Sequence, residues 1–160
     1  MIKEMITGTV SAVVGYATGW IRNEKKLNKE IERIQMLSDK HNALFMLMNQ
    51  WVRVKQDGKG VIDYLNRKGY KEVAVYGMGC VGETLARELC GSDIEIRYGI
   101  DREADNIYAE FKVVKPDEWL EKVDAVIVTS ITFFEEIAGD LCTKIDCPIL
   151  SLEDILYEIE

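Results

Sequence analysis

One short stretch constrains the fold of this chain more than any other: three glycines in the order G-x-G-x-x-G. The apolar run at residues 73–76 before it predicts a β-strand, and residues 83–90 after it predict an amphipathic helix. In such a turn the first glycine permits a sharp bend, the second lets a phosphate approach the backbone, and the third lets helix and strand pack closely. The helix start offers free N–H groups to an anion. The segment Gly77-Met78-Gly79-Cys80-Val81-Gly82 is therefore our candidate phosphate-binding turn.

Asp101 supplies a second part of the pattern. It lies 19 residues after Gly82, at the end of a predicted second strand. A carboxylate there can accept hydrogen bonds from both ribose hydroxyls of a dinucleotide. Arg102 could reach a 2′-phosphate, but Asp101 would repel one, so NAD is favoured over NADP. Two interpretations without a ligand stay open. In the first, the glycines only shape a tight turn between strand and helix. In the second, Asp101 caps a helix or ends its strand in solvent.

Strand-like and helix-like segments alternate after residue 60. Strands are predicted at residues 73–76, 94–100, 111–114, 125–129 and 148–150, and helices at 61–68, 83–90, from 116 onward, 133–143 and after 151. Pro116 suits the first turn of its helix, and Ser151 suits the cap of the last one. The nearly continuous apolar run at 125–129 is typical of a parallel strand covered on both faces. We therefore expect an α/β fold, with an open parallel Rossmann-like sheet of about five strands and flanking helices.

A long helical arm is predicted before the sheet. Residues 22–56 carry a stripe whose members are four and three residues apart, as in a coiled-coil seam: Leu27, Ile31, Ile34, Ser38, His41, Phe45, Met48 and Val52. From Leu44 onward the stripe broadens, as expected where a helix docks on a larger body. The expected domains are an apolar segment at 1–21, a long amphipathic helix at 22–56, and a Rossmann-like nucleotide-binding domain with a C-terminal helix at 61–160.

The apolar segment at residues 5–21 allows three interpretations. It has no charge, and Ser11, Gly15 and Gly19 recur four apart, as in membrane helices that approach closely. Basic residues follow at once, and such a flank tends to remain in the cytoplasm. The segment is 17 residues long, which is the lower limit of length for a helix that spans a membrane, and it is only weakly hydrophobic. It is a membrane anchor, a helix buried against a partner subunit, or a floppy tail.

The charge distribution restricts the partners. A net charge of −8 argues against a general nucleic-acid binder, which needs a basic surface. Residues 1–60 carry 10 Lys and Arg against 6 Asp and Glu, whereas residues 61–160 carry 10 against 22. A basic arm thus precedes an acidic body. The expected partners are a small-molecule nucleotide and, through the N-terminal helix, a second copy of the chain or another protein. The expected location is the cytoplasm, with the inner face of the membrane as an option.

No complete catalytic set accompanies the glycine turn. The only histidine, His41, lies on the helical stripe, where packing or an interface is expected. Tyr64 and Lys68 have the Y-x-x-x-K spacing of short-chain dehydrogenases, but they precede the glycine turn, whereas the pair follows it in that family. Thr129, like Ser130 after it, follows the most apolar strand, at the sheet edge where ligands bind in open α/β folds.

The four cysteines do not predict a disulfide framework or a metal site. Cys142 and Cys147 are separated by four residues, and only one histidine could add to them. Cys80 is interpreted as a small buried residue, although a helix N-terminus can lower the pKa of a thiol.

The combined pattern over residues 71–150 resembles the NAD(P)-binding Rossmann family. The matching residues are Gly77, Gly79, Gly82 and Asp101, with Val75, Leu85 and Leu89 as supporting core positions. The resemblance implies a bound dinucleotide, NAD, at the glycine turn. The residues expected to contact the cofactor are Gly77, Met78, Gly79, Cys80, Val81, Gly82, Asp101, Arg102 and Thr129.

A longer set of positions is similar to small nucleotide-binding domains of bacterial surface-polysaccharide proteins. These domains occur as the N-terminal domains of sugar acetyltransferases and as the C-terminal domains of some sugar methyltransferases. The matching positions are Tyr76, Gly77, Gly79, Gly82, Ile100, Asp101, Pro116, Asp124, Val128 and Thr129. In that family the turn holds a nucleotide-sugar or goes unused, and this chain lacks both catalytic modules. We therefore expect an accessory or sensor protein linked to polysaccharide biosynthesis. The alternatives are an NAD-dependent oxidoreductase completed by oligomerisation and a non-binding structural scaffold.

Overall fold

The computed structural model describes the backbone of residues 2–159 and the side chains of residues 23–159. The chain divides into two units, Met1–Asn42 and Ala43–Glu160. Helix α1 (Ile2–Gln56) begins in the first unit and ends in the second, which we call the body. Leu47, Trp51 and Val54 of this helix are buried in the core of the body, which confirms that the helix docks there from about residue 44. The body therefore begins earlier than residue 61.

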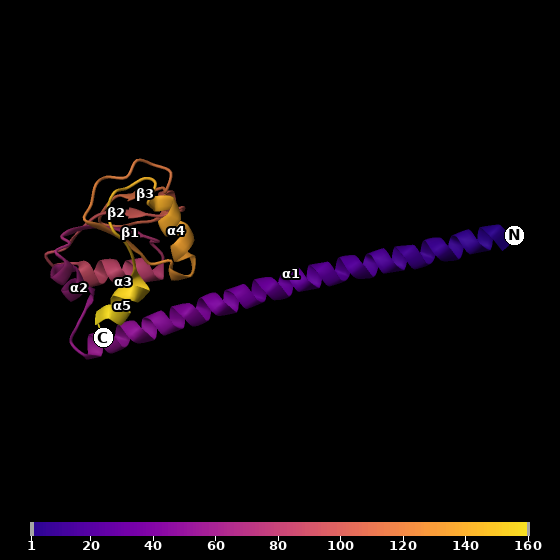
Figure 1. Cartoon of the computed structure of the whole chain (residues 1–160), viewed down its shortest axis with the longest axis horizontal. Helices are drawn as coiled ribbons and strands as arrows, with labels where there is room; N and C mark the ends of the chain where they lie inside the picture. Colours follow the sequence, from indigo (N-terminus) through magenta and orange to yellow (C-terminus); the bar gives the residue numbers. More distant parts are fainter. Residues whose placement is uncertain (1, 160) are drawn as a thin grey trace. The chain divides into compact units, whose positions relative to one another are not determined.

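The body is built on a five-stranded parallel sheet in the order β3-β2-β1-β4-β5 (Figure 1). The strands are β1 (Glu72–Tyr76), β2 (Glu95–Ile100), β3 (Val113–Val114), β4 (Ala125–Val128) and β5 (Ile149–Ser151). Every neighbouring pair is parallel. Because the chain adds β2 and β3 on one side of β1 and then β4 and β5 on the other, the carboxyl ends of β1 and β4 mark the switch point of the sheet. The predicted fold class is confirmed.

Helices cover both faces of the sheet. On one face lie α2 (Val61–Lys68), α3 (Cys80–Leu89), α5 (Leu152–Ile159) and the end of α1, packed on Val73 and Val75 (Figure 1). On the other face, α4 (Phe134–Leu141) packs over Ala74 and Tyr76. Two short 3-10 helices, η1 (Ala104–Asn106) and η2 (Ile131–Phe133), follow β2 and β4. Since alternate side chains of β1 enter both cores, its residues 73–76 must all be apolar, and only Glu72 at its start is exposed.

A buried carboxylate joins three helices on the first face. The Glu88 side chain of α3 is 5% exposed and accepts hydrogen bonds from Trp51 Nε1 (2.6 Å) and from the backbone N–H of Val61 (2.7 Å). Lys55 Nζ lies 2.8 Å from Oε1, the same oxygen that accepts the Val61 bond, and Trp51 bonds Oε2. A buried charge is costly unless it is paired and hydrogen-bonded, and here three donors meet it. Glu88 therefore fixes the end of α1 and the start of α2 against α3.

The helix predicted from Pro116 onward is absent. Residues 116–118 form a turn in which Lys115 N–H donates to Glu118 Oε1 (3.0 Å) and Glu118 N–H donates to Lys115 O (3.1 Å). The chain then continues without a helix, and buried Leu120 packs in the second core. Tyr98 donates its hydroxyl hydrogen to a backbone carbonyl of this segment. The segment is pinned along the sheet, which a helix would prevent, so the prediction was wrong.

Ser151, predicted to cap the last helix, directly precedes α5, which starts at Leu152. It is also the last residue of β5, and its backbone pairs with Val128. The position of the predicted cap is therefore confirmed, and the hydrogen bond from its hydroxyl to the helix stays a prediction.

Within the described part of the chain, none of the helices combines the length and the hydropathy that crossing a membrane requires. The anchor predicted at residues 5–21 lies outside the residues whose side chains are described. Its three interpretations therefore stay predictions.

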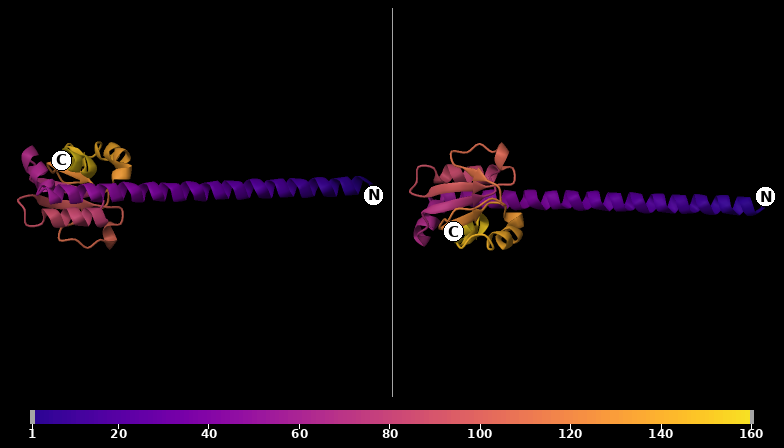
Figure 2. Two further views of the ribbon diagram at one scale, coloured as in Figure 1. Left: turned by 90° about the horizontal axis from the view of Figure 1, so that it is seen from below. Right: turned by 90° about the horizontal axis from the view of Figure 1, so that it is seen from above.

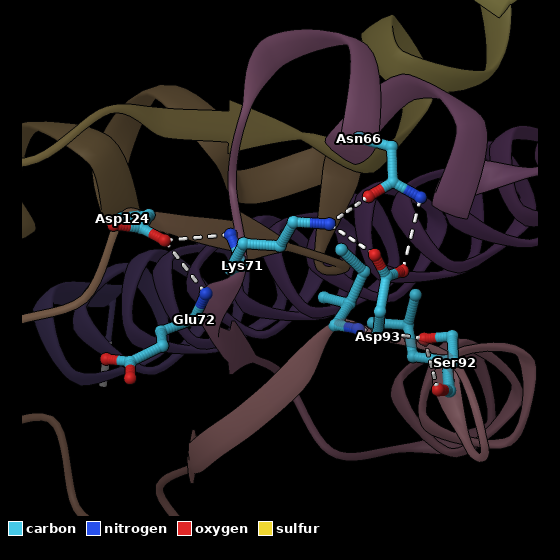
Figure 3. Close-up of polar contacts among 8 residues, drawn as sticks. Asn66, Lys71, Glu72, Ser92, Asp93 and Asp124 are labelled. Atoms are coloured by element: carbon cyan, nitrogen blue, oxygen red, sulfur yellow. Dashed lines mark hydrogen bonds and ion pairs between the residues drawn. The ribbon is translucent and has the colours of Figure 1, made fainter.

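At the amino edge of the sheet, Asp124 holds the start of β1 (Figure 3). One carboxylate oxygen, Oδ2, accepts hydrogen bonds from the backbone N–H groups of Glu72 (2.9 Å) and Lys71 (2.8 Å). These two bonds favour the charged form and hold the pKa of Asp124 below its ordinary value. The Lys71 ammonium in turn contacts Asn66 Oδ1 (2.6 Å) and Asp93, which ties α2 to the loop before β2.

Asp124→Asn should destabilise the protein by about 1 kcal/mol at neutral pH, because the exposed carboxylate loses two charge-assisted hydrogen bonds. Since its folded-state pKa is lowered, its contribution is present above the unfolded value of about 3.9 and is lost as the pH falls through the folded value. Urea unfolding at pH 7 and near pH 3 should show a difference that becomes smaller in acid. Glu110→Gln, which changes an exposed loop carboxylate, is the control. An equal deficit at both pH values would contradict the charge effect.

Candidate functional site

The glycine turn begins at Gly77, where β1 ends at the switch point of the sheet. Gly77 has a φ of 91°, a left-handed conformation that L side chains rarely adopt. A Cβ atom there would lie 2.7 Å from both Thr129 Oγ1 and Ser130 Oγ. The Gly77 N–H donates to Ile100 O (2.8 Å), so the backbone is held in place. The chain's own geometry therefore requires glycine at this position.

Gly82, in the first turn of α3, is required for a different reason. A Cβ atom there would overlap the carbonyl oxygen of Gly77. Gly82 is buried, so no movement into solvent relieves this contact. The bare backbone lets α3 begin directly against the turn, as the third glycine of the pattern predicts.

Gly79 differs from the other two glycines. Its φ of −73° and ψ of −165° are extended values that any residue adopts. A Cβ atom there would have no heavy atom of the described residues within 4 Å. Gly79 is exposed and occupies the N-cap of α3, where Ser, Thr, Asp or Asn would stabilise the helix better. Packing and backbone conformation thus do not explain the missing side chain, whereas a ligand group lying against the backbone would.

The start of α3 presents N–H groups beside Gly79. Along α3, the Glu83 N–H is the first to form a helical hydrogen bond, which it donates to the carbonyl oxygen of Gly79 (2.9 Å). The N–H groups of residues 80–82 come before it and have no acceptor within the helix. Met78 and Val81 are buried, but Gly79 and Cys80 are exposed. An anion can therefore approach these N–H groups at the positive end of the helix. The exposure also corrects the interpretation of Cys80 as a buried residue, because the first helical residue faces away from the core.

Asp101, at the end of β2, contacts the turn. Its Oδ2 atom accepts a hydrogen bond from the backbone N–H of Met78 (2.7 Å), and its Oδ1 atom accepts one from Glu103 N–H (3.0 Å). A carboxylate offers about four acceptor positions, so each oxygen keeps one for a further donor such as a ribose hydroxyl. Arg102 beside it is exposed. The structure therefore brings the predicted acid to the glycine turn, with a backbone bond that the sequence did not reveal.

Thr129 supports the turn from the neighbouring strand. Its side chain is 6% exposed, and its Oγ1 atom donates to the carbonyl of Gly77 (2.6 Å), with Tyr76 O 3.1 Å away. The hydroxyl hydrogen is thus used within the protein. Ser130, the next residue, is less buried, and its hydroxyl lies beside Gly77. Thr129 positions the turn, and Ser130 is the better placed of the two to meet a ligand.

A hollow of about 420 Å³ lies along the same edge of the sheet, at the ends of β4 and β5. The first turns of α4 and α5 border it, and these two helices lie next to each other in both views of Figure 2. Its lining residues are Ile131, Thr132, Phe133, Phe134, Glu135, Glu136, Ser151, Glu153 and Asp154. Four are carboxylates and none is basic, so the hollow repels anions and suits a neutral or positively charged group.

Sequence reasoning missed this hollow. Its residues come from two segments, 131–136 and 151–154, which only the pairing of β4 with β5 brings together. Ser151, a residue that is 5% exposed, lies at the wall of the hollow. Among the described residues no group of His, Cys, Asp or Glu is arranged to hold a metal ion.

The predicted dehydrogenase-like pair lies in α2. Tyr64 is in the first core, and burial raises the pKa of its hydroxyl above the ordinary value. Lys68 Nζ pairs with Glu158 of α5 at 3.0 Å. Neither contact involves a residue of the glycine turn. His41 is exposed and belongs to the first unit.

Alanine substitutions should distinguish the three glycines. Gly82→Ala should cost about 3 kcal/mol or more, because its Cβ atom overlaps backbone. Gly77→Ala should cost about 1–3 kcal/mol for its positive φ and close contacts. Gly79→Ala should change the free energy of unfolding by no more than about 1 kcal/mol, because alanine is a poorer N-cap but also makes the unfolded chain less flexible. Urea unfolding of the three variants checks this order, and a Gly79→Ala protein as unstable as Gly82→Ala would reveal a structural need for the bare position.

The chain matches no protein-family model, no curated protein and no solved structure. Its function is therefore inferred from the geometry of its own residues.

Proposed function

We propose that the body binds a nucleotide, NAD or a nucleotide-sugar, with its phosphates at the start of α3. The observation that carries this proposal is Gly79: an exposed, extended and bare backbone position beside free helical N–H groups. Its two companion glycines are needed by the fold, but Gly79 is not. A phosphate that lies against the backbone would need this position to be bare.

The groups around the turn fit the parts of a nucleotide. The N–H groups of residues 80–82 suit phosphate oxygens, and the free acceptor positions of Asp101 suit ribose hydroxyls. The same carboxylate disfavours a 2′-phosphate, which supports NAD over NADP. The acidic hollow by β4 and β5 is one strand away from the turn, since β4 lies between β1 and β5. It suits the positively charged nicotinamide ring of NAD⁺ or a neutral sugar.

An accessory or sensor role is supported by the side chains at the turn. Among the described residues at the turn, the Thr129 hydroxyl is bonded to a carbonyl, and the Cys80 thiol has no hydrogen bond to a histidine or carboxylate. The only histidine lies in the other unit. A nucleophile without a base, or an acid–base group without a partner, gives little catalysis. We infer that chemistry on the bound molecule is carried out by another protein, in polysaccharide biosynthesis if the ligand is a nucleotide-sugar.

Calorimetric titration with NAD, NADP and UDP-sugars tests the binding. We expect one of the nucleotides to bind and Gly79→Val to weaken that binding by more than about tenfold, because the new side chain occupies the phosphate position. Gly139→Val is the matched control. Gly139 is an exposed glycine of α4 whose Cβ position is equally empty, so this variant should bind as the parent does.

Two results would contradict the proposal. If none of the nucleotides binds at millimolar concentration, the body is a structural scaffold that binds no nucleotide. Oxidation of NADH by the purified protein with a carbonyl substrate would agree with nucleotide binding but contradict the accessory role, because it would show an oxidoreductase. Thermal unfolding of both valine variants checks that any lost binding is not lost folding.

A further inference from the structure

Helix α1 leaves a row of large apolar side chains exposed. In the first unit these include Leu27, Ile31 and Ile34, and in the body they include Phe45 and Val52, with exposed fractions between 44% and 68%. Single exposed apolar residues are normal on a protein surface, but a contiguous row of them marks an interaction site. We therefore expect another protein surface to cover this row.

The row has the spacing of a coiled-coil seam. Its members, Leu27, Ile31, Ile34, Ser38, His41, Phe45, Met48 and Val52, alternate steps of four and three residues over more than three heptads. This repeat of 3.5 residues keeps one face of a helix turned to another helix. We call these eight residues the seam. Met48 is the one member that also packs on the core of the body, beside Leu47, Trp51 and Val54, which attach α1 to it.

The seam has a polar centre with three apolar positions on each side. Ser38 and His41 form this centre. Polar residues at seam positions specify register, because burying them against apolar side chains costs free energy. When the seam of a second copy is aligned on the same centre, its polar residues lie opposite polar residues and its apolar residues lie opposite apolar residues. This holds for a parallel pair, in which Ser38 meets Ser38, and for an antiparallel pair, in which Ser38 meets His41.

The residues beside the seam also suit a second copy. Flanking positions decide which helices pair, since like charges there repel identical chains. In α1 these positions are Asn28, Glu30, Gln35, Leu37, Asn42, Leu44, Asn49 and Trp51, so only one of them is charged. The charged residues of the helix, such as Lys29 and Arg33, lie at the outer positions instead. Identical helices can therefore approach without charge repulsion along the seam.

We propose that the seam of α1 pairs with the same seam of a second copy of this chain, forming a homodimeric coiled coil. At the body end, an apolar hollow of about 400 Å³ continues the surface beside Met48 and Val52. Its other lining residues are Trp51, Lys55, Gln56, Thr84 and Glu88. The hollow gives side chains of the second copy room to pack on the body. This pairing also supplies the packing that a long exposed helix needs, since helix propensity alone stabilises little.

Light scattering coupled to size-exclusion chromatography tests the proposal on the full chain. The parent should elute with twice the chain mass of 18.3 kDa. Ile34→Glu should raise the dissociation constant by at least about 100-fold and give monomers, because it places two carboxylates in the seam. Met36→Glu is the matched control: Met36 is similarly exposed but lies two residues on, on the outer side of the helix, so this variant should remain dimeric.

The outcomes separate the possible occupants. A monomeric parent at 100 μM or so would overturn the proposal and leave the seam to a different protein. Equal masses for the Ile34→Glu and Met36→Glu proteins would also overturn it, since association would then use another surface, such as the first 22 residues. Amide hydrogen exchange of the buried strands β1 and β4 should stay unchanged in both variants, which shows that the body remains folded.

Discussion

Of the described glycines, Gly82 leaves the least room for a side chain, because a Cβ atom there would overlap the carbonyl oxygen of Gly77. Because no side chain separates the two residues, α3 can start directly under the end of β1, and its first N–H groups face the switch point of the sheet. Any side chain at residue 82 would push the helix away from the strand. The position of α3, and with it the packing of Leu85 and Leu89 in the first core, depends on this contact.

The turn is shaped before any ligand arrives. Thr129 holds one carbonyl, Asp101 holds one N–H, and the Gly77 N–H is bonded to the second strand. A site whose backbone is already fixed loses little conformational entropy on binding, which favours affinity. These contacts within the protein account for the shape of the turn. The bare and unhindered Gly79 is the feature that the internal contacts leave unexplained.

The sequence predicted the parts of the fold that follow from local patterns. The apolar runs located all five strands, and the steps of four and three located α1 and its docking region near Leu44. The segment from Pro116 was misjudged, because contacts with the sheet override its helical start signal. Such contacts join residues far apart in the chain, and no local pattern encodes them.

The same limit applies to the candidate site. The spacing of the three glycines and Asp101 was enough to place them together at one edge of the sheet. It did not distinguish Gly79 from its companions, which needs the position of every neighbouring atom. It also gave no sign of the acidic hollow, whose two segments meet only through the parallel pairing of β4 and β5.

The Glu88 cluster has a consequence for any attempt to excise the sheet as a fragment. A polypeptide starting at Val61 would keep the carboxylate and lose two of its donors, Trp51 and Lys55. It would also expose the part of the first core in which Leu47 and Val54 are packed. A protease cut in the linker at 57–60 would be tolerated only while the severed helix stayed docked. The smallest independently folding piece of this chain therefore includes the last four turns of its first helix.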